Sequence, residues 1–372
     1  MKRYTYAAPC LMGVEKLLSN ELKFMGAENV CAENGRVIFT GDLSMLARAN
    51  IRSRIAERVL LLTARFEAYS FEQLFQRVKA INWSEYLDPN AKFPVSGSCL
   101  SSKLMSVPDC QAIIKKAIVE SLKTVYKKDI FPENGAEYKI KFLILKDQVS
   151  IMLDTSGRPL HKRGYRAESN DAPMKETLAA ALCELSRVRS NHIVIDPCCG
   201  SGTILIEAAM KALNLPPNLH GHFAAEEWRF IPKSIWDDER TLAESEIRRD
   251  VTFHAYGYDI DDNALAISKR NAQFAGVADF ITFEHRDLAD FKEDFERATV
   301  ICNPPYGERL LDVSQAEDLY RIMGKVFVKK QGWSYTVICP DDDFQKCFGR
   351  SADKRRKLYN GTLSCQAYIY YK

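Results

Sequence analysis

The sequence predicts an α/β protein in which a smaller α+β region precedes a doubly wound sheet that ends in an antiparallel hairpin. From residue 191 onward, apolar strands alternate with amphipathic helices, as in NHIVIDP followed by GTILIEAAMKAL. This alternation requires crossover connections, and hence a largely parallel sheet with helices on both faces. The last residues, KRRKLYNGTLSCQAYIYYK, form two β-rich runs around Asn360 and Gly361, a strong hairpin signal. The first 160 residues mix helix and strand signals without such alternation.

Composition indicates a soluble globular protein of about two domains. The chain has 372 residues, of which 46% are hydrophobic and 27% charged. It contains no run of eighteen apolar residues and no long apolar stretch with a cleavage site at its start, so we expect a cytoplasmic protein without a membrane segment. The eleven cysteines are odd in number and lack a CxxC pair. We therefore expect buried thiols, with neither a disulfide framework nor a metal site.

Charge is unevenly distributed along the chain. Residues 1–160 contain 23 Lys and Arg against 17 Asp and Glu, a net +6, whereas the remainder contains 29 against 32, a net −3. A basic first part attached to a near-neutral body suits a module that binds a polyanion. An excess of six cations is equally compatible with an ordinary solvated surface.

Residues 1–160 are predicted to form two successive α+β units. Helical spacing of apolar residues indicates helices at 13–26, 71–87 and 108–128. Strand signals lie at 35–41 and 92–106, at the end of 43–66, and in two runs within 137–157 that a KDQ turn separates. The helix at 108–128 is the most regular, and its polar side contains Lys115, Lys116, Lys123, Lys127 and Lys128.

Residues 161–372 are the predicted second domain. It starts with a basic stretch, LHKRGYR, which could clamp an anionic backbone or pack as a hinge. Asp171, Pro173 and Glu176 then have the pattern of a helix N-terminus. Strands are expected at 191–197, 253–261, 279–288, 298–305 and 333–340, with helices at 202–213, 264–276 and 318–330. A second basic run, 354–357, precedes the last hairpin and is typical of a solvated strand entry.

The stretch IDPCCGSGTILIEAAM has the pattern of a cofactor loop between a strand and a helix. Gly200 and Gly202 permit a sharp turn and close approach of a ligand, and Asp196 lies at the carboxyl end of the strand, where open sheets bind ligands. The third glycine of GxGxxG, which serves a dinucleotide pyrophosphate, is absent. A carboxylate at this place favours the sulfonium and ammonium groups of S-adenosylmethionine over NAD.

The next two strands also end in acidic residues. Asp259, in GYDID, could accept both ribose hydroxyls, and Asp287, in HRDL, could receive the adenine amino group. Each could instead cap the helix that follows it. An inserted segment, 214–250, separates Asp259 from the glycine loop, and the sequence assigns it no role. The predicted cofactor-binding residues are Asp196, Cys198, Gly200, Ser201, Gly202, Thr203, Asp259, Ile260, Asp287 and Asn303.

The fourth strand ends in NPPY, the predicted catalytic residues Asn303, Pro304, Pro305 and Tyr306. The Asn303 side-chain oxygen and the Pro304 carbonyl can accept the two N–H bonds of an exocyclic amine, so that its lone pair points at the methyl donor. Tyr306 offers a face on which a planar substrate can stack. In-line methyl transfer then needs no metal, no covalent intermediate and no dedicated base. Alone, Asn-Pro-Pro could simply terminate a strand.

Together, DPCCGSGTILIEAA, NPPYGERL and LHKRGYR resemble the bacterial large-subunit ribosomal RNA guanine-N2-methyltransferases that have an N-terminal THUMP domain. The resemblance implies a class I methyltransferase fold after a ferredoxin-like and THUMP RNA-binding region. It also implies S-adenosylmethionine as cofactor and the N2 amine of a guanine in 23S ribosomal RNA as substrate. Some members have a second methyltransferase domain, whose activity we do not expect here. Glu308 and Arg309 extend the motif.

RNA is therefore the expected partner, and the sequence indicates no oligomeric state. The candidate RNA-contacting residues are Lys115, Lys116, Lys123, Arg163 and Arg166. NPPY also occurs in enzymes that methylate DNA adenine or protein glutamine, so these substrates and transfer RNA guanine remain alternatives. A non-enzymatic alternative is an RNA-binding ribosome-assembly factor with a vestigial cofactor site.

Overall fold

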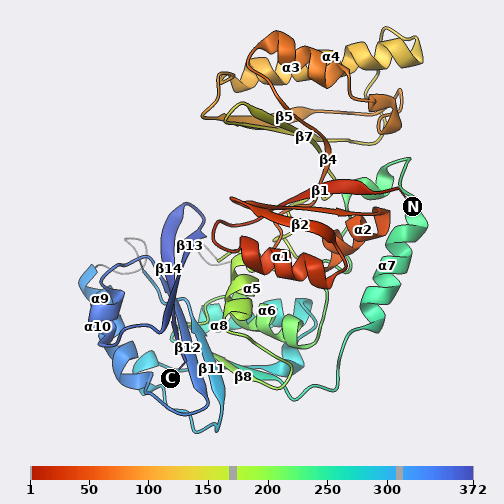
Figure 1. Cartoon of the computed structure of the whole chain (residues 1–372). Coiled ribbons are helices and arrows are strands. Elements are labelled where there is room, and N and C mark those ends of the chain that lie inside the picture. The colour runs from red at the N-terminus through yellow and green to blue at the C-terminus, as the bar shows by residue number, and fades with distance from the viewer. Residues whose placement is uncertain (1, 167–173, 307–312, 372) are drawn as a thin grey trace.

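Two seven-stranded sheets organise the chain, as a computed structural model shows (Figure 1). The structure describes residues 2–166, 174–306 and 313–371. All strands of the first sheet lie between Tyr4 and Asp154, and all strands of the second lie between Ile193 and Tyr370. The predicted order of an α+β region followed by a doubly wound sheet is confirmed.

The first sheet has the strand order β2-β3-β1-β4-β7-β6-β5. The long strand β4 joins its two halves, because Leu60 and Leu61 pair with β1 while the whole strand pairs with β7. The strands are β1 (Tyr4–Pro9), β2 (Glu28–Glu33), β3 (Arg36–Gly41), β4 (Leu60–Glu67), β5 (Val95–Leu100), β6 (Ile140–Leu145) and β7 (Gln148–Asp154).

Four helices belong to this first part: α1 (Glu15–Phe24), α2 (Leu43–Arg52), α3 (Phe71–Lys79) and α4 (Val107–Tyr126). Three of them begin where a short polar side chain accepts a hydrogen bond from a backbone N–H three residues later. The capping residues are Asp42, Ser70 and Ser106. Such caps satisfy amide groups that the first helical turn leaves unpaired.

The second sheet has the order β10-β9-β8-β11-β12-β14-β13. Its first five members run parallel, and the antiparallel β13–β14 hairpin completes it at one edge, as predicted. The strands are β8 (Ile193–Asp196), β9 (His254–Asp259), β10 (Ile281–His285), β11 (Ala298–Cys302), β12 (Trp333–Cys339), β13 (Lys354–Asn360) and β14 (Leu363–Tyr370). In this order, β9, β8 and β11 are neighbours, so their carboxyl ends meet at one edge.

The helices around the second sheet are α5 (Glu176–Leu185), α6 (Thr203–Ala212), α8 (Asp262–Phe274), α9 (Val313–Val326) and α10 (Phe344–Phe348). In α5 and α6 nearly every side chain is buried. A helix that is apolar all round must be covered on all sides. One core of buried side chains accordingly extends from α1, α2 and β3 through α5 and α6 to β8.

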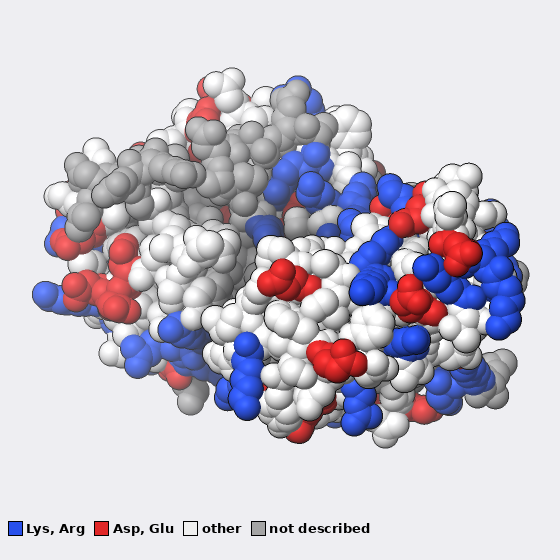
Figure 2. All heavy atoms as spheres, turned by 90° about the horizontal axis from the view of Figure 1, so that it is seen from above, with Lys and Arg blue, Asp and Glu red and all other residues white. Residues whose placement is uncertain are grey.

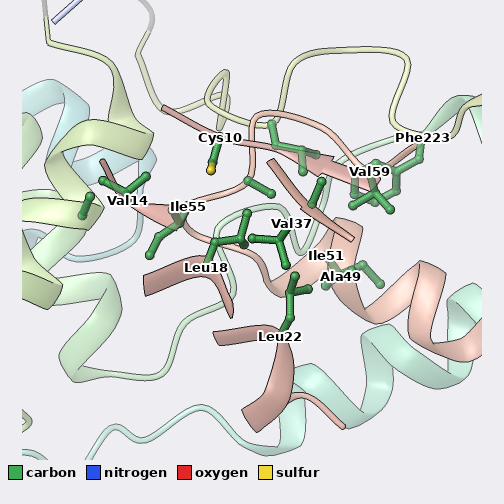
Figure 3. Close-up of a cluster of buried hydrophobic side chains, with 14 of the residues drawn as sticks. Cys10, Val14, Leu18, Leu22, Val37, Ala49, Ile51, Ile55, Val59 and Phe223 are labelled. Carbon is green, nitrogen blue, oxygen red and sulfur yellow. The ribbon is translucent and has the colours of Figure 1, made fainter. Parts of the chain in front are cut away.

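The inserted segment 214–250 packs on the first part of the chain. It contains α7 (Lys233–Ser245), which lies beside α2 (Figure 1). Two nitrogens of Arg48 in α2 donate to the two carboxylate oxygens of Glu239 in α7, at 2.9 and 2.6 Å. The Trp228 ring stacks on Tyr138 with centroids 4.9 Å apart. Phe223 enters the core next to Val59 (Figure 3). The insertion therefore packs on both halves of the first part of the chain.

The basic stretch at 161–166 is partly buried against this junction, which corrects the expectation that Arg163 contacts RNA. The Arg163 side chain is 1% exposed. Its guanidinium donates to the carbonyls of Leu160 and Arg54, each at 2.5 Å, and lies 3.4 Å from a Glu207 oxygen. A buried cation needs such partners because desolvation is costly. Arg163 therefore holds the two parts of the chain together.

Glu57 joins the first part of the chain to α5. Its carboxylate accepts hydrogen bonds from Thr177 and His161 and lies 3.2 Å from the Lys175 ammonium. Burial alone would raise the pKa of Glu57, but these hydrogen bonds and the Lys175 charge outweigh it and lower the pKa to about 2.

Glu57→Gln is expected to lower the free energy of unfolding at pH 7 by about 2–3 kcal/mol. The stability from Glu57 is fully present above its unfolded pKa near 4.5 and is lost as pH falls toward 2. The variant should therefore lose less stability than the wild type between pH 5 and pH 3. Thermal unfolding at both pH values measures this, with Glu296→Gln as a control because that side chain is 91% exposed. Equal pH dependence of the two proteins would contradict the assignment.

Candidate active site

The loop between β8 and α6 forms a tight, glycine-dependent turn. Gly200 and Gly202 have φ values of +52° and +77°, which favour glycine. A Cβ at Gly202 would lie 3.0 Å from the Ser268 Cβ and 3.2 Å from Cζ of Phe283. A Cβ at Gly200 would meet nothing within 4 Å, so this glycine faces open space above the sheet. The loop thus presents bare backbone at the carboxyl edge.

Asp259, at the end of β9, holds this loop. Its Oδ2 accepts a hydrogen bond from the Gly200 N–H at 2.8 Å, and its Oδ1 accepts one from Asp261 N–H at 3.0 Å. A carboxylate has further lone pairs, so these bonds still permit contact with ribose hydroxyls. The next residue, Ile260, is 67% exposed and offers an apolar surface beside Asp259.

Asp196, at the end of β8, is buried at 1% exposure with no cation beside it among the described residues. Burial raises the pKa of Asp196 to about 8; the nearby Asp259 charge adds to the increase, and a hydrogen bond from the Cys198 N–H, at 3.1 Å, opposes it. A cationic ligand bound beside Asp196 would stabilise the ionised carboxylate, which has no other cation near it among the described residues.

Ser201, Thr203 and Cys198 are the remaining predicted loop residues, and Arg166 donates a hydrogen bond to one of them, Thr203. The Ser201 carbonyl accepts a hydrogen bond from Asn271 in α8, at 3.1 Å. One Arg166 nitrogen donates to Thr203 Oγ1 at 2.8 Å and to the Met174 carbonyl at 2.9 Å. Its other terminal nitrogen lies 3.6 Å from Glu176. Sequence reasoning proposed Arg166 as an RNA contact, whereas its guanidinium is bonded to the cofactor loop.

Arg166→Met is expected to weaken S-adenosylhomocysteine binding about threefold to tenfold, since it removes the hydrogen bond that holds Thr203. Its affinity for RNA should stay within twofold of wild type. Lys162→Ala is the matched control, because this exposed lysine belongs to the same basic stretch. Calorimetry measures the affinity for S-adenosylhomocysteine, and fluorescence anisotropy with labelled RNA measures the affinity for RNA. A variant that loses RNA affinity but keeps cofactor affinity would restore the original RNA-contact prediction.

Asp287 follows β10 and is exposed. Its Oδ1 accepts a hydrogen bond from the Ala289 N–H at 2.8 Å, so the residue caps the short 3₁₀ turn Leu288–Asp290. Capping is the alternative role given above for Asp287. It uses only one of the two carboxylate oxygens, so the other is not engaged by this cap. Contact with adenine stays a prediction.

The NPPY residues follow β11, directly beside β8. Asn303 Oδ1 is buried and has no hydrogen-bond partner among the residues that the structure describes. Leaving such an acceptor unpaired costs about 1–3 kcal/mol, and groups of this kind cluster at functional sites. Pro304 is buried, and Tyr306 is half-buried with its hydroxyl bonded to Asn360. Glu308 and Arg309 lie outside the described residues.

The lysines proposed for RNA contact lie on α4, which belongs to the first part of the chain and not to the sheet that carries NPPY. Lys116 is exposed, whereas the Lys115 ammonium lies 2.5 Å from Glu133 and Lys123 lies 3.2 Å from Glu120. Figure 2 shows Lys and Arg spread across the face viewed from above, with Asp and Glu between them. None of the three is buried. Their role in RNA binding stays a prediction.

Within residues 2–166, 174–306 and 313–371, no group of three or more His, Cys, Asp and Glu side chains could hold a metal ion. In the same part of the chain, no helix is both long and apolar enough to cross a bilayer.

Comparison with protein families covers most of the chain. Residues 5–60 match the RlmL ferredoxin-like domain, and residues 68–154 match the THUMP domain. Residues 163–369, more than half of the chain, match the RMKL-like methyltransferase domain. The chain belongs to the RMKL-like methyltransferase family. The first sheet of this methyltransferase is thus a ferredoxin-like domain joined through β4 to a THUMP domain.

Relatives of this methyltransferase match it over almost their whole length. The "Putative RNA methyltransferase YpsC" of Bacillus subtilis (strain 168) is 42% identical, covering 100% of this chain and 97% of the relative. The structure named "SMU.472, a putative methyltransferase complexed with SAH" is 39% identical with a TM-score of 0.94, covering 100% of this chain and 98% of the other. A Listeria monocytogenes str. 4b F2365 structure named a predicted N6-adenine-specific DNA methylase is 42% identical with a TM-score of 0.94, covering 100% and 96%.

The cofactor of this methyltransferase is S-adenosylmethionine. The residues present fit it, since the buried carboxyl of Asp196 suits a cationic ligand and the open backbone at Gly200 permits close approach. When bound, the cofactor supplies the electrophilic methyl group. The individual cofactor contacts of the predicted residues remain proposals.

Proposed function

We propose that this enzyme methylates the exocyclic N2 amine of a guanine in RNA, with large-subunit (23S) ribosomal RNA as the substrate. The observation that most supports amine chemistry is the buried Oδ1 of Asn303, which has no hydrogen-bond partner within residues 2–166, 174–306 and 313–371 and lies beside the strand that leads into the cofactor loop. Such an acceptor is satisfied when an N–H donor arrives. The THUMP domain and the relative named as an RNA methyltransferase support RNA as the substrate class.

In the proposed reaction, Asn303 and the Pro304 carbonyl accept the two N–H bonds of the amine. The amine of a base is a weak nucleophile because its lone pair is delocalised into the ring. Two acceptors steer the nitrogen toward tetrahedral geometry and aim the lone pair at the methyl group. Held in this way, the nitrogen would be aligned for in-line attack on the methyl group that bound S-adenosylmethionine would supply, with the neutral thioether as leaving group.

The proton of the amine is lost to water after attack, when the product nitrogen is cationic and strongly acidic. No described side chain is required to remove it in the transition state. Asn303 Oδ1 stabilises the positive charge that develops on the amine, because an amide oxygen is the negative end of a dipole. Tyr306 holds the base by stacking, and the target must leave its helical stack to reach it.

RNA binding is proposed to involve the THUMP domain, with Lys116 as its exposed contact on α4 and Lys115 and Lys123 as secondary contacts. Phosphate contacts of this kind position the RNA without reading sequence. Arg163 is excluded from this set by its burial. The division of the chain near residue 160 into binding and catalytic parts remains part of the same proposal.

The experiment is nucleoside mass spectrometry of ribosomal and transfer RNA from a strain that lacks the gene, before and after adding the enzyme and S-adenosylmethionine. N2-methylguanosine should be missing from large-subunit RNA and should return on addition. A methyl group that is missing only from transfer RNA would keep the chemistry and change the substrate.

A second candidate is DNA adenine-N6 methylation, which the name of the Listeria relative favours. An exocyclic adenine amine offers Asn303 the same two N–H donors. This candidate predicts methylation of duplex DNA and little loss of activity when the THUMP lysines are replaced. A non-enzymatic assembly factor would instead show no transfer to any nucleic acid.

A further inference from the structure

The β13–β14 hairpin extends beyond the carboxyl edge of the second sheet. The last residue of β12, Cys339, pairs with Gln366, whereas β13 and β14 continue pairing as far as Asn360 and Leu363. The three residues beyond Gln366 correspond to about 10 Å of extended strand. Gly361, with φ of +65°, closes the turn. The turn of the hairpin therefore lies on the side of the sheet where β11 leads into NPPY.

At this turn, the Asn360 side chain contacts the hydroxyl of Tyr306. Its Nδ2 donates a hydrogen bond to Tyr306 Oη at 2.9 Å. Burial raises the pKa of Tyr306, so the hydroxyl stays neutral and can accept this bond at physiological pH. The thiol of Cys365, on β14 and 1% exposed, also lies against the Tyr306 hydroxyl. The far end of the ring is thus held by both strands of the hairpin.

The ferredoxin-like domain contacts the same hairpin. A Cβ at Gly13 would lie 2.3 Å from the Lys357 carbonyl oxygen, so the two backbones touch at this point. Glu15 fixes the Gly13 loop by accepting hydrogen bonds from the N–H groups of Gly13 and Gly35, each at 3.0 Å. In Figure 1 the hairpin rises beside the strands of this domain. The strand that presents Asn360 is therefore braced by a domain outside the catalytic sheet.

We propose that Asn360 is a positioning residue of the reaction, which fixes the Tyr306 ring as the stacking surface for the target base. The inference rests on the proposed function, in which Tyr306 stacks on a base. A tyrosine after a strand end can rotate about its two side-chain torsions, and each orientation other than the observed one would misplace the base relative to the methyl group. Small misplacements of a bound reactant can reduce the rate about a hundredfold.

The test compares Asn360→Leu, which keeps the approximate volume but removes the donor, with Asn360→Gln, which keeps an amide donor. Asn360→Leu is expected to reduce kcat about tenfold at saturating RNA and cofactor. Its affinity for S-adenosylhomocysteine should stay within twofold of wild type, and Asn360→Gln should recover part of kcat. Thr362→Ala is the control, because Thr362 is exposed in the same turn.

A double-mutant cycle with Tyr306→Phe isolates the contact. The phenylalanine variant keeps the stacking face and loses the hydroxyl, so Asn360→Leu should have little further effect on kcat in its presence. Additive losses would overturn the inference, because the two side chains would then act independently. An unchanged kcat in the Asn360→Leu variant would also overturn the inference. So would a melting temperature of this variant low enough to account for the lost rate by unfolding.

Failure of the proposed function gives a different result. In that case wild-type enzyme transfers no methyl group to guanine in ribosomal RNA. The same variants are then compared on the nucleic acid that wild-type enzyme does methylate, where equal kcat values for wild type and Asn360→Leu overturn the positioning role.

Discussion

Replacing Asn303 with alanine is expected to reduce methyl transfer by at least about a hundredfold. Cofactor affinity should stay nearly unchanged, because the other predicted cofactor-binding residues remain in place. The substitution removes the buried Oδ1 that we assign to the amine, which is an interaction needed in the transition state. It leaves β11 intact, because all the backbone pairing of that strand ends at Cys302. Single-turnover transfer from S-adenosylmethionine to RNA measures the rate, and calorimetry with S-adenosylhomocysteine measures the affinity.

The matched control is Asn20→Ala, which alters an exposed asparagine on α1 and should keep full activity. If Asn303→Ala loses cofactor affinity together with transfer, the residue shapes the cofactor site and the amine assignment fails. If transfer continues at the wild-type rate, an acceptor other than Asn303 directs the amine.

The second large effect is expected at Asp196 and depends on pH. Because burial raises its pKa to about 8, the carboxyl is mostly protonated at pH 6 in the free enzyme. A cationic cofactor favours the ionised form, so affinity should rise with pH by up to about tenfold per unit between pH 6 and pH 8. The neighbouring thiols of Cys199 and Cys302 do not titrate here, since burial raises their pKa values well above the usual range.

Asp196→Asn keeps the shape of the side chain and removes the ionisation. We expect the variant to bind S-adenosylmethionine with a nearly constant affinity from pH 6 to pH 8, and about tenfold or more weaker than wild type at pH 8. The variant should fold normally, because the wild-type carboxyl is itself largely neutral at neutral pH. A wild-type affinity that is flat or falls with rising pH would contradict the role of Asp196.

The second sheet and its ligand-binding edge could be predicted because they depend on local periodicity. Alternating apolar strands and helices specify parallel strands, and the carboxyl ends of neighbouring parallel strands meet at one edge. Asp196, Asp259 and Asn303 follow such strands, so their positions at one edge follow from the pattern. The closing hairpin was similarly evident, although its two turn residues are Gly361 and Thr362 and Asn360 ends the strand.

Elements of the first sheet were harder to predict. In β1 the buried residues are consecutive, and in β2 the side chains are largely exposed, so neither strand alternates between buried and exposed positions. The helix expected at 71–87 ends at Lys79 and is followed by a separate 3₁₀ turn at Trp83–Glu85. The Trp83 ring is buried, and its indole N–H donates to the Val78 carbonyl at 2.8 Å. Tertiary packing of one large ring therefore overrides the helical pattern.

The positions of Arg163 and Arg166 could not be predicted from the sequence. Arg163 and Arg166 lie in a basic stretch that is indistinguishable from a solvated one by composition. Their partners, Glu207 and Thr203, are about forty residues away on α6. The inserted segment presents the same difficulty, because the surface on which it packs is formed by distant residues of the first part of the chain, such as Arg48 and Tyr138. Contacts between distant segments decide both cases.

The central claim is that the NPPY site transfers a methyl group from S-adenosylmethionine to the exocyclic amine of an RNA base. The most direct measurement uses cofactor with a deuterated methyl group, unmodified large-subunit ribosomal RNA, and the wild-type and Asn303→Ala enzymes side by side, followed by nucleoside mass spectrometry. We predict labelled N2-methylguanosine with wild-type enzyme and almost none with the variant. Label on a ring nitrogen, a carbon or a ribose oxygen, or equal label with both enzymes, would contradict the account.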